Sequence, residues 1–239
     1  MNKINYGFDA PGIMRNFFIF GSLLLTAAIT LFALTDGLLF TIAGSLLLVG
    51  AVVLLALGNI MFFYGIRGKF VMKDFMLGKV KWTGNETVLD VGTGRGLFMN
   101  GAAKKLTTGK SIGIDIWNQE DLSGNTVENA YINAGLENVT GKIDIKNEDV
   151  RQMSFADNSF DVVFSMYCLH NIEEKTGQEK ACVEIARVLK PGGKVLIGDF
   201  VPTHDYAAWF AKAGLTVVSS KNYFTVALAP MWMVEATKP

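Results

Sequence analysis

The sequence predicts an α/β domain built on a largely parallel sheet, preceded by a helical hairpin that spans a membrane. Three observations predict this arrangement. Between Asn16 and Ile66 there is no Lys, Arg or Glu, and Asp36 is the only charged residue. After Thr83, short β-rich runs alternate with helical stretches, which is typical of parallel strands joined by crossover helices. The first of these strands leads into a glycine-rich turn, and a helical stretch follows that turn.

The hairpin is predicted over residues 1–66, with apolar helices at about 17–34 and 38–64. A bilayer core of about 30 Å requires about 20 apolar helical residues, so both runs are long enough to cross it. Asp36 and Gly37 favour a tight turn between the two runs. A cleaved signal peptide is disfavoured because the first run is too long. A buried hairpin of a soluble protein is disfavoured because neither run has a polar face.

The flanking charges predict the orientation of this hairpin. The nearest cations all lie beyond its two outer ends: Lys3, Arg15, Arg67, Lys69 and Lys73. The positive-inside rule therefore places both termini and the following domain in the cytoplasm, which makes the chain an integral membrane protein with the lipid bilayer as a partner. Residues 67–82 are predicted to form an amphipathic linker helix, which either lies at the headgroup level or packs on the following domain. Neither apolar run contains a Gly-xxx-Gly pair, so the sequence does not predict close helix dimerisation.

The domain predicted over residues 83–239 contains seven strands and four main helices. The strands are expected near 87–91, 111–115, 142–145, 161–165, 194–199, 216–220 and 231–236. The helices are expected near 97–106, 126–134, 178–189 and 205–213. No helix-length segment separates the last two strands, so they should form an antiparallel hairpin at the end of the sheet.

Composition excludes several classes of function. The formal net charge is zero and no cluster of five or more basic residues occurs, which argues against a nucleic-acid partner. Cys168 and Cys182 match neither a zinc-site nor a redox-motif spacing, and they are expected to be reduced thiols. No cluster of residues predicts a bound metal.

The strongest motif runs from Asp90 to Gly96 and contains Gly92, Thr93, Gly94 and Gly96. Glycines in such a turn let the backbone approach a ligand closely, at the edge of a parallel sheet where nucleoside cofactors bind. A nicotinamide-dependent reductase is disfavoured because the dinucleotide fingerprint would need a third glycine at position 97, which is Leu. The observed spacing suits a cofactor without a pyrophosphate. S-adenosylmethionine is such a cofactor, and the Asp90 carboxylate can attract its ammonium group.

Two later carboxylates complete the predicted cofactor site. Asp115 ends the second strand and can accept both ribose hydroxyls, although a surface turn is the alternative reading. Asp149 follows the third strand and can accept from the adenine amino group, or it can be a helix or turn cap. Val150 can pack beside the adenine ring. Ile116 and Ser165, near the ends of the second and fourth strands, belong to the same predicted set.

These motifs together resemble those of the class I S-adenosylmethionine-dependent methyltransferases. Besides the residues above, the resemblance rests on Phe160 to Val163 and on Leu189 to Gly193, and it covers about residues 83–239. It is nearest to the small-molecule group that includes the ubiquinone and menaquinone C-methyltransferases. It implies a Rossmann-like seven-stranded sheet with the order 3-2-1-4-5-7-6, in which only strand 7 is antiparallel. The hairpin lies outside the resemblance.

The acceptor side is predicted to follow the fourth strand, at residues 165–171. Relatives often carry a Leu-His-His run there, whereas this chain has Asn171 in the second histidine position. His170 can orient or deprotonate an acceptor, or it can be a hydrogen-bonded structural histidine. Tyr167 is a weaker catalytic candidate, and so is His204. Methyl transfer needs no base when the acceptor is a thiolate, an amine or an enolate, because positioning then supplies most of the rate.

The predicted function is therefore transfer of a methyl group from S-adenosylmethionine to a small, hydrophobic and lipid-soluble acceptor by a membrane-anchored enzyme. Alternatively, the hairpin only anchors the enzyme to the membrane, and the substrate is water-soluble. A different class of function is a membrane-docked sensor or scaffold subunit that binds S-adenosylmethionine without turnover. Because the predicted cofactor residues all follow Thr83, the chain from Arg67 onward is expected to fold and bind the cofactor alone.

Overall fold

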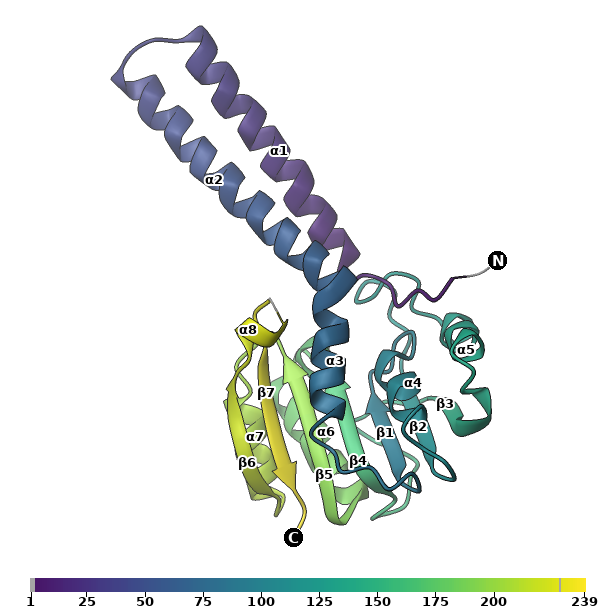
Figure 1. The fold of residues 1–239 in the computed structure, drawn as a ribbon. Coiled ribbons are helices and arrows are strands. Elements are labelled where there is room, and N and C mark those ends of the chain that lie inside the picture. The colour runs from purple at the N-terminus through teal and green to yellow at the C-terminus, as the bar shows by residue number, and fades with distance from the viewer. Residues whose placement is uncertain (1–2, 228) are drawn as a thin grey trace.

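The computed structural model describes residues 3–227 and 229–239, and Figure 1 shows a hairpin of two long helices rising from a sheet domain. The hairpin consists of α1 (Pro11–Leu34) and α2 (Leu38–Phe63). Helix α1 begins six residues before the predicted position because Pro11 occupies its first turn, where a missing N–H costs nothing. Both helices are long and apolar enough to cross a membrane, by length and composition.

Small residues bring α1 and α2 into close contact. They recur at intervals of seven and are all buried: Gly21 and Ala28 on α1, and Gly44, Ala51 and Gly58 on α2. A Cβ atom added to Gly21 would lie 2.9 Å from Cγ of Leu55, so the two backbones approach each other at that point. Seven residues make almost two helical turns, which keeps these positions on one face. A Gly-xxx-Gly pattern, with its four-residue spacing, does not reveal this seven-residue repeat.

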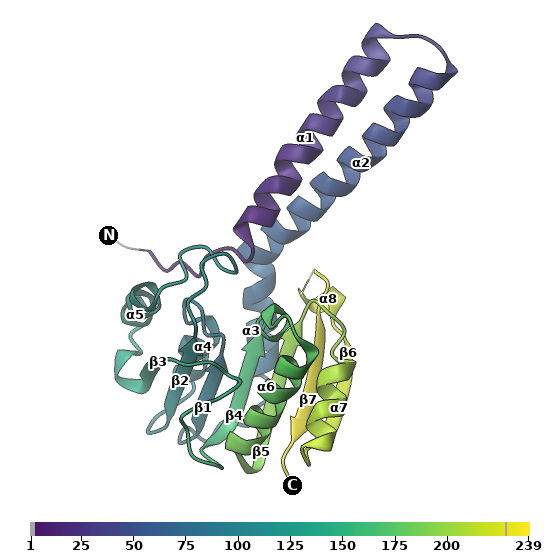
Figure 2. The same ribbon diagram turned by 180° about the vertical axis from the view of Figure 1, so that it is seen from behind.

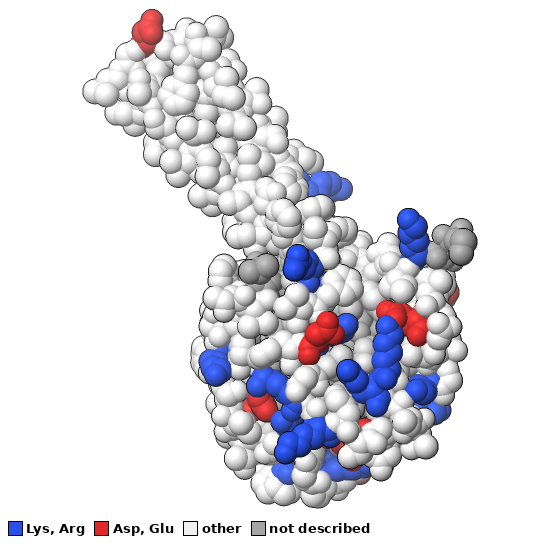
Figure 3. Space-filling model, viewed as in Figure 1, with Lys and Arg blue, Asp and Glu red and all other residues white. Residues whose placement is uncertain are grey.

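The outward face of the hairpin is apolar. Leu34 and Leu38 are each 77% exposed, and Figure 3 shows an uncharged surface along most of the hairpin up to an acidic side chain at its far end. A contiguous exposed apolar surface of this size is rare on proteins that stay in water.

Helix α2 continues without a break through a π-helical turn, η1 (Tyr64–Gly68), into α3 (Lys69–Leu77). Helix α3 buries Met72, Met76 and Leu77 against the sheet. Of the two alternatives for residues 67–82, the structure therefore shows packing on the domain. The helix ends at Leu77, five residues earlier than predicted.

The sheet has seven strands in the order β3-β2-β1-β4-β5-β7-β6. Strand β7 pairs antiparallel with both neighbours and the other pairs are parallel, which confirms the predicted topology. The strands are β1 (Thr87–Val91), β2 (Lys110–Asp115), β3 (Ile143–Asn147), β4 (Phe160–Met166), β5 (Leu189–Asp199), β6 (Thr216–Asn222) and β7 (Trp232–Thr237). Strand β5 begins five residues before the predicted start because Leu189 already pairs with Phe160.

Helices cover both faces of this sheet. The remaining helices are α4 (Leu97–Ala103), α5 (Val127–Leu136), α6 (Lys175–Val188), α7 (His204–Lys212), α8 (Phe224–Ala227) and the 3₁₀ turns η2 (Thr140–Lys142) and η3 (Leu169–Asn171). Helices α3, α4 and α5 lie on one face, and α6 and α7 lie on the other (Figures 1 and 2). Strand β1 contributes to both cores, since Val88 packs with α3 and α4 while Leu89 packs with α6 and α7.

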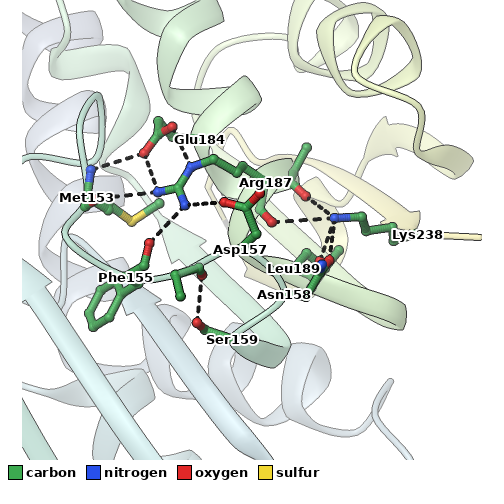
Figure 4. A network of polar contacts seen from close by, with 11 residues as sticks. Met153, Phe155, Asp157, Asn158, Ser159, Glu184, Arg187, Leu189 and Lys238 are labelled. Carbon is green, nitrogen blue, oxygen red and sulfur yellow. Dashed lines mark hydrogen bonds and ion pairs between the residues drawn. The ribbon is translucent and has the colours of Figure 1, made fainter.

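Two basic side chains fasten the end of α6 to neighbouring loops, as Figure 4 shows. Arg187 donates to Glu184, to Asp157 and to the backbone oxygens of Met153 and Phe155. Lys238 donates to the backbone oxygens of Ala186 and Leu189, which end the helix, and to Asn158 Oδ1. The loop before β4 and the C-terminal segment are thereby tied to one helix end.

Candidate functional site

A cavity of about 440 Å³ lies at the carboxyl ends of β1, β2 and β4. This is the edge of an open parallel sheet at which ligands usually bind. Among the predicted site residues, those that line the cavity are Gly92, Gly94, Asp115, Ile116, Asp149, Val150 and Tyr167.

The glycine loop forms the floor of the cavity. Gly92, Gly94 and Gly96 all have positive φ angles, of 69°, 54° and 85°. A Cβ atom on Gly92 would lie 2.6 Å from Cβ of Cys168, and one on Gly94 would lie 2.7 Å from Leu122. Glycine is therefore required here both for backbone conformation and for space.

Asp115 is held in place by the backbone around it. Its Oδ2 accepts from the Gly94 amide at 2.8 Å. Its Oδ1 accepts from the Trp117 amide at 2.7 Å and from the Asn125 side chain at 3.2 Å. The carboxylate therefore joins the glycine loop to the end of β2 and still borders the cavity.

Asp90 lies beneath the glycine loop and does not line the cavity. Its Oδ2 accepts from the Thr93 hydroxyl at 2.8 Å and from the Met99 amide at 2.9 Å. Burial raises the pKa of Asp90 to about 7, although the hydrogen bond from Thr93 opposes the shift. Thr93 and Gly96 also lie outside the cavity lining, where they shape the loop.

Asp149 lies at the predicted adenine end, next to Ile116 and Val150 in the cavity wall. Arg151 donates from Nε to both oxygens of Asp149, at 2.9 and 3.0 Å, and these bonds lower the pKa of Asp149. Sequence reasoning missed Arg151. An adenine amino group would share the Asp149 carboxylate with this guanidinium.

The acceptor side is formed by the segment after β4. Tyr167 lines the cavity with a φ of 52°, which is unusual for a bulky side chain, and its hydroxyl donates to the Pro230 carbonyl.

His170 stands outside the cavity lining, with Nδ1 2.7 Å from Oδ1 of the fully buried Asp199. Ser165 is also outside the lining, because its hydroxyl donates to the Val91 carbonyl between strands. His204 is exposed beside Asp205, away from the cavity.

Asp9 is a cavity residue that sequence reasoning missed. The segment before α1 lies across the loop that follows β2. The Phe8 amide donates to Ser123 Oγ, the Ser123 amide donates to the Phe8 carbonyl, and the Ala10 amide donates to the Asp121 carbonyl. No motif in this segment could have shown this contact, because it brings together residues more than 110 positions apart.

The cavity wall is strongly acidic. Among the described residues that line it, seven are acidic and one, Arg151, is basic. The acidic residues are Asp9, Asp115, Asp121, Glu148, Asp149, Glu173 and Glu174. S-adenosylmethionine carries a sulfonium and an ammonium group against one carboxylate, so its net positive charge suits this wall. The residues present therefore fit this cofactor.

Residues 89–197 match the family model described as "Methyltransferase domain". This match supports a class I methyltransferase domain over this part of the chain. The curated relatives agree with this assignment. The chain is 32% identical over 127 residues to the ubiquinone/menaquinone biosynthesis C-methyltransferase UbiE of Geotalea daltonii, covering 53% of this chain and 50% of the relative. It is 34% identical over 131 residues to the sterol 4-C-methyltransferase strm-1 of Caenorhabditis elegans, covering 54% of this chain and 35% of the relative. The methyltransferase domain thus spans half or less of these relatives.

Solved structures show the same fold. A methyltransferase bound to the Trm112 activator of Haloferax volcanii superposes with a TM-score of 0.60 at 19% identity, covering 76% of this chain and 94% of the other. The geranyl diphosphate C-methyltransferase of Streptomyces coelicolor, solved with S-adenosyl-L-homocysteine, superposes with a TM-score of 0.60 at 12% identity, covering 72% and 79%. The family match and the curated relatives support an S-adenosylmethionine-dependent methyltransferase domain with S-adenosylmethionine as its cofactor.

Proposed function

We propose that this protein transfers a methyl group from S-adenosylmethionine to a small hydrophobic acceptor that it draws from the membrane spanned by its hairpin. One observation carries the proposal: the hairpin rises from the same edge of the sheet at which the cavity lies (Figure 1). Tyr64, in the π-helical turn below the hairpin, packs with its ring centroid 4.9 Å from that of the cavity residue Tyr167. An acceptor that leaves the bilayer beside the hairpin would therefore reach the cavity by a short path.

The names of the relatives support a lipophilic acceptor. One relative is named for ubiquinone and menaquinone biosynthesis, and another for sterol methylation. Met166, which precedes Tyr167 in the cavity wall, is also apolar. This end of the cavity accordingly suits an apolar molecule, whereas most of the acidic residues lie elsewhere in the wall and suit the cationic cofactor.

The cofactor would supply a methyl group on an electrophilic sulfonium. In this proposal the backbone of Gly92 and Gly94 holds its amino-acid end, and Asp115 accepts hydrogen bonds from the ribose hydroxyls. Ile116 and Val150 pack beside the adenine, and Asp149 accepts from the adenine amino group. Asp199 positions His170, which stands behind the aromatic wall of the acceptor end.

Hairpin orientation is part of the same proposal. Both termini would lie in the cytoplasm, because the juxtamembrane cations flank only the outer ends of the hairpin. A reporter enzyme that is active only outside the cytoplasm, fused after Pro239, should remain silent. A clear reporter signal would contradict this orientation.

The test of the proposal is to incubate source membranes containing the full-length protein with cofactor labelled in its methyl group. We expect label in the lipid-extractable fraction, and none when the protein has been heat-inactivated. Label confined to the aqueous fraction would disprove a membrane-derived acceptor. No label in either fraction would favour a protein that binds the cofactor without turnover.

A further inference from the structure

The segment before α1 brings a carboxylate to the cavity from outside the methyltransferase domain. Asp9 lines the cavity and forms an isolated β-bridge with Leu122. The backbones of Phe8 and Ala10, on either side of it, are bonded to the loop after β2. Asp9 is thus held in place by its neighbours and is not a freely moving terminal residue.

One oxygen of this carboxylate lacks a hydrogen bond within the described part of the chain. Asp9 Oδ2 is buried and accepts no hydrogen bond among the described residues. The nearest cation is Lys69, whose Nζ lies 3.8 Å from that oxygen. Lys69 is 3% exposed and already donates to the carbonyls of Tyr6 and Gly7, so its ion pair with Asp9 is long and provides no hydrogen bond to Oδ2. A buried acceptor of this kind is costly unless a ligand supplies a donor.

Asp9 lies close to the acceptor side of the cavity, because its neighbour Phe8 packs against Gly65 and the adjacent Tyr64 contacts Tyr167. Its charge contributes to raising the pKa of Tyr167, after the larger effect of burial. Burial raises the pKa of Asp9 itself, and Lys69 and His170 oppose that shift. The charged and titratable groups around Asp9 and its neighbour Lys69 are Lys69 itself, Arg95, Asp121, His170, Tyr64 and Tyr167. Asp9 therefore lies between the glycine loop, which Leu122 contacts, and the end of the cavity where the acceptor is proposed to bind.

We propose that Asp9 is a catalytic residue, whose unpartnered oxygen binds a neutral acceptor through its acidic X–H group and removes the proton during methyl transfer. This inference rests on the function proposed above and narrows its substrate class to acceptors that must lose a proton. The Asp9 carboxylate takes the proton while the electron pair of X forms the new bond to the methyl carbon. The carbon–sulfur bond breaks with its electron pair remaining on sulfur, so the products are X–CH₃, S-adenosylhomocysteine and a protonated Asp9. Asp9 then releases the proton to water.

The competing role is a bond from Asp9 to the ammonium group of the cofactor. The two roles predict different effects of Asp9 on the affinity for S-adenosylhomocysteine. This product has the same ammonium group as the cofactor but no methyl group to transfer. An ammonium ligand would contribute to the affinity for this product. A residue that binds the acceptor would not.

The experiment compares the full-length wild type with Asp9→Asn, Asp9→Glu and the control Asp74→Asn. Asp74 lies on α3 with its side chain 72% exposed, outside the cavity lining. Three quantities are measured: affinity for S-adenosylhomocysteine by calorimetry, the infrared carboxyl band that titrates with pH, and single-turnover transfer of labelled methyl to a total lipid extract of the source membranes.

We expect Asp9→Asn to bind S-adenosylhomocysteine within about twofold of wild type and to lose about 10²-fold or more in transfer rate. The wild-type rate should rise with pH as Asp9 deprotonates and then level off. Asp9→Asn should lose this dependence and one titrating carboxyl band. Asp9→Glu should recover part of the rate, and Asp74→Asn should match wild type.

Two results would overturn the inference while leaving the proposed function intact. One is an active wild type with an equally active Asp9→Asn. The other is a tenfold or larger loss of S-adenosylhomocysteine affinity in Asp9→Asn with Asp9→Glu restoring it, which would assign Asp9 to the cofactor. If the wild type itself transfers no label to lipid, the proposed function fails and this inference fails with it.

Discussion

Asp115 holds the glycine loop in place and is also the residue that we propose accepts hydrogen bonds from the cofactor ribose. It accepts from Gly94, Trp117 and Asn125 and still borders the cavity. Asp115→Asn keeps the shape of the side chain but removes its charge, and hydrogen bonds to charged groups contribute about 1.5–3 kcal/mol. We expect a roughly ten- to hundredfold loss of affinity for S-adenosylhomocysteine, measured by calorimetry. The control Asp144→Asn, on β3 and outside the cavity lining, should bind normally. Normal binding by Asp115→Asn would remove Asp115 from the site.

Asp90 should couple cofactor binding to proton release. In the free protein burial holds its pKa at about 7, so near pH 7 about half of the molecules carry this proton. A cation bound nearby favours the carboxylate and lowers that pKa. Binding of S-adenosylmethionine near pH 7 should therefore release up to about half a proton, and less at pH 9, where Asp90 is already ionised. Calorimetry in buffers of different ionisation enthalpy measures this release.

Asp90→Asn provides the control for the proton measurement, because it has no proton to release at this position. S-adenosylhomocysteine, which lacks the sulfonium charge, should release less than S-adenosylmethionine does. An equal proton release by wild type and Asp90→Asn would show that another group is responsible.

The predicted site residues that line the cavity belong to short local motifs. The glycine loop and Asp115 are recognisable because each follows a strand directly, and the sheet then brings the strand ends together. Asp9 could not be predicted in this way, because its position depends on a contact with the Leu122 region. Arg151 was missed because its effect on Asp149 depends on side-chain geometry rather than on spacing.

At the scale of elements, the strand order was predictable because the resemblance specifies it and alternating strands and helices require parallel pairing. The join between the hairpin and the domain was less predictable. Residues 64–77 form one continuous helical path, because Tyr64, Met72 and Met76 all bury side chains in the sheet domain. In the sequence, the second apolar run passes into the amphipathic run without a break. The sequence therefore does not show where the helix leaves the exposed hairpin and begins to pack on the sheet domain.

The seven-residue repeat of small residues makes a prediction about the hairpin. Gly21→Leu places a side chain where a single Cβ atom would already lie 2.9 Å from Cγ of Leu55 and 3.2 Å from its backbone nitrogen. Overpacking of this kind costs about 1–3 kcal/mol. We expect faster amide hydrogen exchange in α1 and α2 of the detergent-solubilised protein. Gly12→Leu is the matched control, since nothing lies within 4 Å of a Cβ atom at Gly12. Unchanged exchange in Gly21→Leu would show that the close packing of α1 and α2 is not required.

At the scale of the whole molecule, the hairpin and the methyltransferase domain are joined at two points that both reach the active-site edge. The segment before α1 supplies Asp9, and the π-helical turn after α2 supplies Tyr64. From the sequence, residues 1–66 are expected to be dispensable for cofactor binding, because every recognisable cofactor motif follows Thr83. Deleting residues 1–66 would remove the cavity residue Asp9 and the Tyr64 ring that contacts Tyr167, along with the apolar hairpin.

The structure also indicates how to separate these two contributions. Gly58 packs against the Phe18 ring, with a hypothetical Cβ atom 3.2 Å from it, so α1 and α2 are adjacent near the domain. A short Gly/Ser turn in place of residues 20–56 would join Ile19 to Leu57 and keep both Asp9 and Tyr64. This excised protein should bind S-adenosylhomocysteine like the full chain. It should also methylate the acceptor lipids in detergent, because the cavity wall remains complete.

In bilayers the excised protein should lose most of its methyl-transfer rate. Without the apolar hairpin, the cavity is no longer held at the membrane, where the local concentration of the acceptor is high. The deletion of residues 1–66 should differ from it by failing in detergent as well, because it also lacks Asp9. Labelled methyl transfer to the lipid extract, measured in vesicles and in detergent for all three proteins, distinguishes these outcomes. Full activity of the excised protein in vesicles would show that the apolar hairpin does not deliver the acceptor. Equal activity of the deletion and the excised protein in detergent would show that the segment before α1 and the π-helical turn do not contribute to the site.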